Sequence, residues 1–237
     1  MPAGWADVFD EKGVIFVSAA KSGNGENVIG RRIPLALLGA YNIMRRYDID
    51  SERVYVGGFS GGARVALRVA LAYPDFFRGA LLNAGSDPIA DKEAFLPPDD
   101  LFSQFQNSSR IVFVTGTKDN WNIEHDMASR SSMSSWCVFN TSVETMSGVG
   151  HEVAAASSAR RALAALDSRP PPAAEKVFAC MARVAKAMAA DLNHVQELLD
   201  RERPHDAWRV LSKIDTHYGG LASPDMTQFE QRIGPKR

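Results

Sequence analysis

The strongest signal in the sequence is "VYVGGFSGGARVALRVALAYP", residues 54–74. Residues 53–59 are a short β-branched run typical of a buried strand, and residues 62–74 are a helical run that Pro74 ends. Ser60 stands between the two, in a glycine-rich corner that matches G-x-S-x-G. Strand, corner and helix in this order predict a nucleophile held above a sheet. The competing interpretation is a glycine-rich turn with no chemistry.

On both sides of this stretch, apolar runs alternate with helical periods, which predicts an α/β fold with a mostly parallel sheet flanked by helices. The predicted strands are residues 13–18, 53–59, 78–85 and 110–116, with a fifth inside 137–146. The predicted helices are residues 33–47, 62–74 and 152–166. Ligands bind such sheets at the carboxyl ends of the strands, so the site is expected there.

A domain boundary is predicted at "SRPPPAA", where consecutive prolines cannot continue a helix. The prediction is an α/β core over residues 1–168, a Pro-rich linker over 169–172 and a helical extension over 173–237. The extension is expected to hold three or four short helices. It is interpreted either as a structural cap or as a surface for a protein partner or self-association. One apolar helix face is formed by Val177, Met181, Val184 and Met188.

Composition and charge limit the classes of function that are expected for this chain. The 237 residues carry a net charge of −1, so no nucleic-acid partner is implied. No apolar run is long enough for a transmembrane helix, and the N-terminal residues are too polar for a secretory signal. The chain as given is therefore expected to be soluble and cytoplasmic by default, or exported if an upstream segment precedes it. Cys137 and Cys180 form no metal or redox motif and are expected to be packed free thiols. No metal-ligand cluster and no cofactor motif are visible.

A nucleophilic serine needs an acid that orients its base, placed after a late strand. Asp119 follows the strand at 110–116 by a short turn and is the candidate acid. Its other interpretation is a turn-forming aspartate. Glu124 and Asp126 are the fallback acids.

The base should follow the last strand. His151 in "MSGVGHEVA" has this place, and Gly148 and Gly150 allow its loop to reach over the sheet. Of the other histidines, His125 comes early, and those of the helical extension are expected at the surface. The order Ser60, Asp119, His151 predicts nucleophilic catalysis, in which the N–H of Gly61 stabilises the oxyanion.

The residues around Ser60 also resemble those of a known family. The stretch "DIDSERVYVGGFSGGARVALRVALAYPDFFRGALLNAGSD", 48–87, resembles α/β-hydrolase serine esterases of the poly(3-hydroxybutyrate) depolymerase and feruloyl esterase group. The resemblance covers residues 5 to about 166. It implies that Ser60 is the nucleophile, Asp119 the acid and His151 the base. It also places the glycine-rich loop 22–27 at the rim of the site, near the substrate.

The resemblance also implies a departure. Residues 13–18 correspond to the family's fourth strand, so the first three strands and the loop with the second oxyanion donor have no counterpart. A start assigned too late, a short form with a closed sheet and a degenerate hydrolase are the three explanations. Candidate substrate contacts are Phe59, Trp121 and Asn122.

The leading hypothesis is a serine hydrolase that cleaves a small-molecule or oligomeric carboxylic ester. The resemblance favours a short-acyl ester, an aryl ester or a hydroxyalkanoate oligomer. A peptidase or thioesterase with the same three residues is the alternative within enzymes. A catalytically weak or inactive hydrolase-fold protein that acts as a binding module is the alternative outside them.

Overall fold

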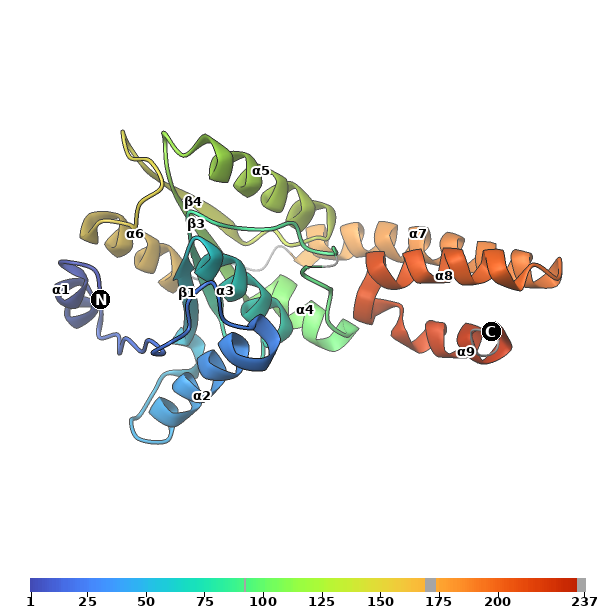
Figure 1. The fold of residues 1–237 in the computed structure, drawn as a ribbon, viewed down its shortest axis with the longest axis horizontal. Coiled ribbons are helices and arrows are strands. Elements are labelled where there is room, and N and C mark those ends of the chain that lie inside the picture. The colour runs from blue at the N-terminus through green and yellow to red at the C-terminus, as the bar shows by residue number, and fades with distance from the viewer. Residues whose placement is uncertain (92, 169–173, 234–237) are drawn as a thin grey trace.

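The computed structural model describes residues 1–91, 93–168 and 174–233. Its centre is a four-stranded parallel sheet in the order β1-β2-β3-β4 (Figure 1). The strands are β1 (Tyr55–Phe59), β2 (Gly79–Asn83), β3 (Arg110–Gly116) and β4 (Thr141–Met146). The predicted parallel α/β architecture is confirmed, and four of the five predicted strands are present within one or two residues of their expected places or inside the expected range.

Helices cover both faces of the sheet. One face carries α1 (Trp5–Lys12) and α6 (Ala156–Asp167), and the other carries α3 (Gly61–Ala72) with α4 (Asp99–Ser108) and α5 (Asn120–Ser135). Alternate residues of β2 serve the two layers: Ala80 and Leu82 pack with α3, and Leu81 packs with α6. Every residue of β2 and β3 is buried, as expected for central parallel strands.

Shorter turns complete this part. A π-helical turn (Val28–Arg32) leads into α2 (Ile33–Met44), which packs beside α3, and a 3₁₀ turn (Ser51–Arg53) leads into β1.

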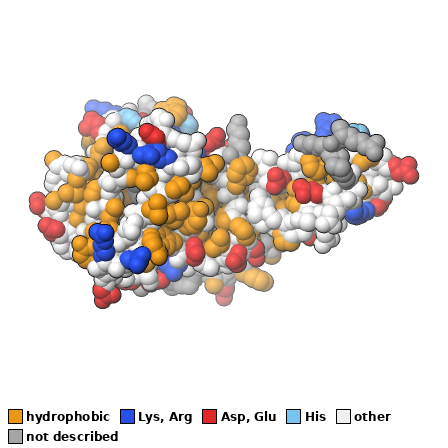
Figure 2. All heavy atoms as spheres, turned by 60° about the horizontal axis from the view of Figure 1, so that its bottom comes forward, with side chains coloured by type: hydrophobic (Ala, Val, Ile, Leu, Met, Phe, Trp, Pro, Cys, Tyr) orange, Lys and Arg blue, Asp and Glu red, His pale blue; other side chains and the backbone are white. Residues whose placement is uncertain are grey.

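Several apolar side chains of the α/β part are exposed. Figure 2, turned so that the lower side of Figure 1 comes forward, shows hydrophobic atoms gathered over the α/β part. The exposed large hydrophobic residues of the first 41 positions include Ile15, Phe16, Val17, Ile29, Leu38 and Tyr41.

The predicted strand at residues 13–18 is wrong. Ile15, Phe16 and Val17 are each 44–46% exposed, and the segment belongs to no sheet. A strand buried on both faces needs hydrogen-bonded neighbouring strands, and no strand of the described residues pairs with this segment. Its side chains pack on helices instead: Phe16 stacks on Phe9 of α1, with ring centroids 5.2 Å apart.

As a result, β1 is an edge strand. Val54 O accepts from Arg78 N and Ser60 N donates to Asn83 O, each at 2.8 Å, so both groups face β2. Alternate residues of a strand face opposite sides, so the backbone groups at the three odd-numbered positions 55, 57 and 59 face away from β2. No strand of the described chain pairs with them.

The C-terminal part is helical, as predicted, with α7 (Ala174–Asp200), α8 (Pro204–Tyr218), a 3₁₀ turn (Gly219–Leu221) and α9 (Ser223–Ile233). The predicted linker at 169–172 lies outside the described residues. The expectation of short helices is wrong for α7, which has 27 residues. Figure 1 shows α7 to α9 extending to one side of the α/β part. None of the helices in the described ranges combines the length and apolar character needed to cross a bilayer.

This helical part packs on the α/β part. Gly220 N donates to Leu96 O at 2.8 Å, and the ring of Trp136 lies edge-on to that of Tyr218 at 5.7 Å. A disulfide joins Cys137, just after α5, to Cys180 of α7. The expectation of free thiols was wrong, because residues 43 apart in sequence meet where α7 lies against the end of α5.

Candidate active site

Ser60 lies on the corner between β1 and α3, in a strained conformation. Its φ is 55°, in the region that side chains other than glycine rarely occupy. The corner also depends on close backbone contacts: a Cβ on Gly58 would lie 2.3 Å from Gly62 C, and one on Gly85 would lie 2.4 Å from Ser60 O. The small residues of "GGFSGG" therefore allow strand and helix to approach closely, as the sequence predicts.

Asp119 lies at the corresponding junction two strands away. It follows β3 and is the N-cap residue of α5, where its carboxylate accepts from Asn122 N at 3.5 Å. The backbone turn is closed by a hydrogen bond from Asp119 N to Gly116 O at 3.0 Å. Helix capping thus fixes the carboxylate at the carboxyl edge of the sheet.

His151 lies on the loop between β4 and α6. Gly148 in this loop has φ +73°, and a Cβ on Gly116 would lie 2.3 Å from Val149 O and 2.4 Å from Gly150 O. Lys118 N donates to Val149 O at 2.9 Å. The His151 loop is therefore packed directly against the end of β3, where only a glycine leaves room.

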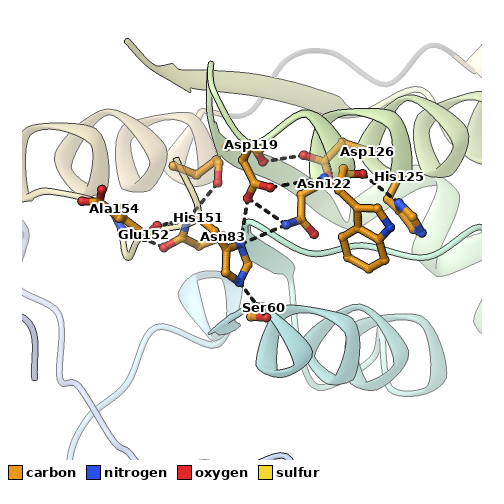
Figure 3. A network of polar contacts seen from close by, with 12 residues as sticks. Ser60, Asn83, Asp119, Asn122, His125, Asp126, His151, Glu152 and Ala154 are labelled. Atoms are coloured by element: carbon orange, nitrogen blue, oxygen red, sulfur yellow. Dashed lines mark hydrogen bonds and ion pairs between the residues drawn. The ribbon is translucent and has the colours of Figure 1, made fainter. Parts of the chain in front are cut away.

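These three side chains form one hydrogen-bonded chain (Figure 3). His151 Nε2 lies 3.0 Å from Ser60 Oγ, and His151 Nδ1 lies 2.7 Å from Asp119 Oδ2. When Nδ1 carries the proton that is donated to Asp119, Nε2 is free to accept a proton from the serine hydroxyl. Ser60 lies 91 residues before His151 in the sequence, and Asp119 lies 32 residues before it. The fold thus brings the three residues together in the predicted order.

The Asp119 carboxylate is held in its ionised form. Burial raises its pKa, but the hydrogen bonds from His151 and Asn122 outweigh burial and leave the pKa below its usual value. Asn122 Nδ2 donates to Asp119 Oδ2 at 2.7 Å and lies 2.9 Å from His151 Nδ1. Asn122 is only 2% exposed, so its amide lies beneath the histidine and the carboxylate rather than at the surface of the site.

The fallback acids lie elsewhere. Asp126 is buried, and its two carboxylate oxygens accept hydrogen bonds at 2.5 Å from Ser86 Oγ and Thr115 Oγ1. Burial outweighs these hydrogen bonds and raises the pKa of Asp126. Glu124 is an exposed residue of α5. Neither carboxylate is hydrogen-bonded to His151 in the described structure.

Two of the candidate substrate contacts, Phe59 and Trp121, carry aromatic rings. The Phe59 ring lies 4.8 Å from the His151 ring. Trp121 is 56% exposed, and its ring centroid lies 3.9 Å from that of His125 and 4.8 Å from the Arg64 guanidinium carbon. Phe59 therefore offers apolar surface beside His151, and Trp121 offers an exposed aromatic ring in the first turn of α5.

Two residues of this region, Asn83 and Asn24, were not predicted from the sequence. Asn83, at the end of β2, is 1% exposed and holds the loop after His151 through a hydrogen bond from Ala154 N at 2.7 Å. The signal for Asn83 was a polar residue ending an otherwise apolar strand, "ALLN". Asn24, in the loop 22–27, lies against Gly61. No sequence pattern identifies that contact.

The start of α3 presents a backbone donor directly after Ser60. Gly61 is the first residue of α3, so its N–H has no acceptor within the helix and lies at the positive end of the helix dipole. Across the described residues, no group of three or more His, Cys, Asp or Glu side chains could hold a metal ion.

Comparison with known proteins now gives the class of fold. An esterase from Pyrobaculum calidifontis superposes with a TM-score of 0.50 and 14% identity, covering 69% of this chain and 68% of its own. Two further proteins are less similar in structure. A Bacillus cereus carboxylesterase has a TM-score of 0.39 and 16% identity, covering 64% of this chain and 66% of its own. Zea mays acyl-protein thioesterase 2 has a TM-score of 0.40 and 16% identity, covering 63% of this chain and 71% of its own. The likeness to the first shows that this chain has an α/β-hydrolase fold.

The chain spans about two thirds of the length of these proteins, 66% for the Bacillus cereus carboxylesterase. No protein-family model matches the sequence, and no curated protein sequence matches it.

Proposed function

We propose that this protein is a serine hydrolase that cleaves carboxylic esters through an acyl-enzyme on Ser60. One observation carries the proposal: Ser60 Oγ, His151 and Asp119 are linked at 3.0 and 2.7 Å, with the serine on a strained strand-to-helix corner. A turn with no chemistry requires neither the strain nor an imidazole aligned with the hydroxyl.

In the acylation half, His151 Nε2 accepts the hydroxyl proton as Ser60 Oγ attacks the ester carbonyl carbon. Asp119 holds the imidazole in the tautomer that leaves Nε2 unprotonated, and it stabilises the imidazolium that forms. The Gly61 N–H donates to the oxyanion. The carbonyl then re-forms, the ester C–O bond breaks, and the proton on Nε2 passes to the leaving alkoxide, which departs as an alcohol.

Deacylation repeats these steps with water as the nucleophile. His151 Nε2 accepts a proton from water as the hydroxide attacks the acyl carbon, and the same proton returns to Ser60 Oγ as the acid is released. Asn122, whose amide donates to Asp119, has the role of a positioning residue in this scheme.

For the substrate we propose a short-acyl ester, an aryl ester or a hydroxyalkanoate oligomer, as the resemblance to depolymerases and feruloyl esterases implies. The open site supports this choice. The His151 side chain is 44% exposed, so solvent and substrate can reach the imidazole. Exposed Trp121 and half-buried Phe59 offer flat aromatic surfaces to such a substrate.

The test is to incubate the full chain with a fluorophosphonate probe and, separately, with p-nitrophenyl acetate, beside Ser60→Ala. The expected result is stoichiometric labelling on Ser60 and turnover that Ser60→Ala reduces to the background. If the wild-type chain shows neither labelling nor turnover above that background, the proposal fails, and a binding role for the fold is favoured instead. Comparing p-nitrophenyl acetate with a thioester of the same acyl group distinguishes an esterase from a thioesterase.

A further inference from the structure

Acyl transfer by a serine requires more than one hydrogen-bond donor for the oxyanion, and the start of α3 supplies the N–H of Gly61. A second side chain touches this residue. An ideal Cβ built on Gly61 would lie 2.5 Å from Asn24 Oδ1, 2.9 Å from its Cγ and 3.1 Å from its Nδ2. The Asn24 carboxamide therefore lies against Gly61, in the space that a Cβ on this residue would fill.

We propose that the Asn24 side-chain amide is the second oxyanion donor of this site. The inference rests on the serine-hydrolase function proposed above and adds a residue to it. A half-turn of the carboxamide about its Cβ–Cγ bond exchanges Nδ2 and Oδ1, which brings Nδ2 to the position nearest Gly61. An N–H of Asn24 and the N–H of Gly61 then point at one carbonyl oxygen, and a side-chain amide is an effective donor in such a hole.

The loop that carries Asn24 is anchored at both ends. Asn27 Oδ1 accepts from Gly30 N at 2.6 Å and caps the π-helical turn at Val28–Arg32. Arg31 Nε donates to Lys21 O at 2.9 Å and lies 3.2 Å from Glu26 Oε2. These contacts fix the flanks of the loop and leave Asn24 at its tip.

The Asn24 amide is available for this role. Its side chain is exposed, and no hydrogen bond joins it to another residue of the described chain. It is also uncharged, so it does not form an ion pair with Asp119 or change the charge of the histidine. A neutral donor beside Gly61 stabilises the negative charge only as that charge develops, which is what lowers the barrier.

The contact with Asn24 also leaves no room for a side chain at position 61. Gly61 has an ordinary helical backbone, so alanine is permitted by its dihedral angles but would place a methyl group where the Asn24 amide lies. The Gly61→Ala substitution keeps the backbone N–H and displaces the side-chain donor. Asn24 and Gly61 should therefore be coupled in catalysis.

The test measures kcat and KM for p-nitrophenyl acetate with Asn24→Ala, Asn24→Asp and, as a matched control on the same loop, Ser22→Ala. The expected result is a fall in kcat of about 10²–10³ for Asn24→Ala, with little change in KM. Asn24→Asp keeps the shape but loses the N–H and adds a negative charge, so it should be slower still. Ser22→Ala should retain wild-type rates.

A double-mutant cycle tests the coupling. Gly61→Ala should slow the wild-type chain and have little further effect on the Asn24→Ala chain, because the group that it displaces is already gone. A loop that merely became loose would instead give losses that add up, and Asn24→Asp would be the milder change.

The outcomes separate this inference from the proposed function. If the wild-type chain is labelled at Ser60 and turns over ester, but Asn24→Ala and Asn24→Asp keep wild-type kcat, the second-donor role is wrong and the esterase stands. If the wild-type chain shows no labelling, the esterase itself fails. Slow but complete labelling of Asn24→Ala at long times would confirm that Ser60 remains an intact nucleophile.

Discussion

The buried side chain of Asn83 accepts a hydrogen bond from the backbone N–H of Ala154, with 2.7 Å between the two atoms. On its other side, Ala154 O accepts from Trp5 Nε1, also at 2.7 Å. Ala154 is three residues beyond His151. The chain that leaves the histidine is thus tied to the end of β2 and to α1, two elements that make no contact with the ester in the proposed mechanism.

The first prediction concerns this link. Asn83→Ala leaves the Ala154 N–H buried without its acceptor, which should lower the free energy of unfolding by about 1–3 kcal/mol. It should also lower kcat, because the imidazole loses a fixed position relative to Ser60. Denaturant unfolding and ester hydrolysis measure the two effects. Asn42→Ala, which removes an exposed amide of α2, is the control and should change neither.

The second prediction concerns the packing of the His151 loop on β3. Gly116→Ala places a methyl group within 2.4 Å of two carbonyl oxygens of that loop, so the loop must move. The expected result is a large fall in kcat for ester hydrolysis. Gly150→Ala adds the same methyl group where no atom lies within 4 Å, and its loss should be much smaller. Equal losses from the two changes would argue against the packing explanation.

The third prediction is that two buried aspartates affect stability with opposite dependence on pH. The pKa of Asp119 is lowered in the folded chain, so its contribution is present above the usual aspartate pKa and is lost as pH falls through the lowered value. The pKa of Asp126 is raised, so its contribution is present below the usual value and is lost as pH rises through the raised one.

These signs can be measured with Asp119→Asn and Asp126→Asn, by following the free energy of unfolding from about pH 3 to about pH 7. Relative to the wild-type chain, Asp119→Asn should become less stable as pH rises, and Asp126→Asn should become more stable. Parallel curves for the two variants would contradict the assignment of the raised pKa to burial of Asp126.

The fourth prediction concerns the disulfide between Cys137 and Cys180. The bridge closes a separation of 43 residues, and the chain-entropy relation gives about 4 kcal/mol for a loop of that size. Replacing both cysteines by alanine should therefore lower the melting temperature while ester hydrolysis persists below it, because neither residue contacts Ser60 or His151. Alkylation of both cysteines in denaturant without reductant would contradict the bridge.

The sequence was a good guide to local structure near the serine. A glycine-rich corner between a β-branched run and an apolar helix has few conformations, so the strand–Ser60–helix unit could be predicted. Asp119 and His151 were candidates because both follow strands of a parallel sheet, whose carboxyl ends meet at one edge. The four strands from residue 55 to 146 lie where their apolar runs indicated.

Contacts between distant segments could not be predicted in this way. Residues 13–18 have the composition of a buried strand, but a strand also needs a hydrogen-bonded neighbour, which no local pattern reports. Helix α5 is polar over most of its length and so gave little periodic signal. The Cys137–Cys180 bridge and the contact of Asn24 with Gly61 depend on how α7 and the loop 22–27 fold back, and only the three-dimensional structure gives that.

The edge position of β1 has a consequence for heat tolerance. Ser60 continues directly from this strand, and the strand is hydrogen-bonded along one side only. Outer strands open more easily than central ones, so the amides of residues 55, 57 and 59 should exchange with solvent deuterium well before those of β2 and β3. On warming, the reactive corner should lose its geometry before the molecule melts, and hydrolysis should decline at temperatures where circular dichroism still reports a folded chain.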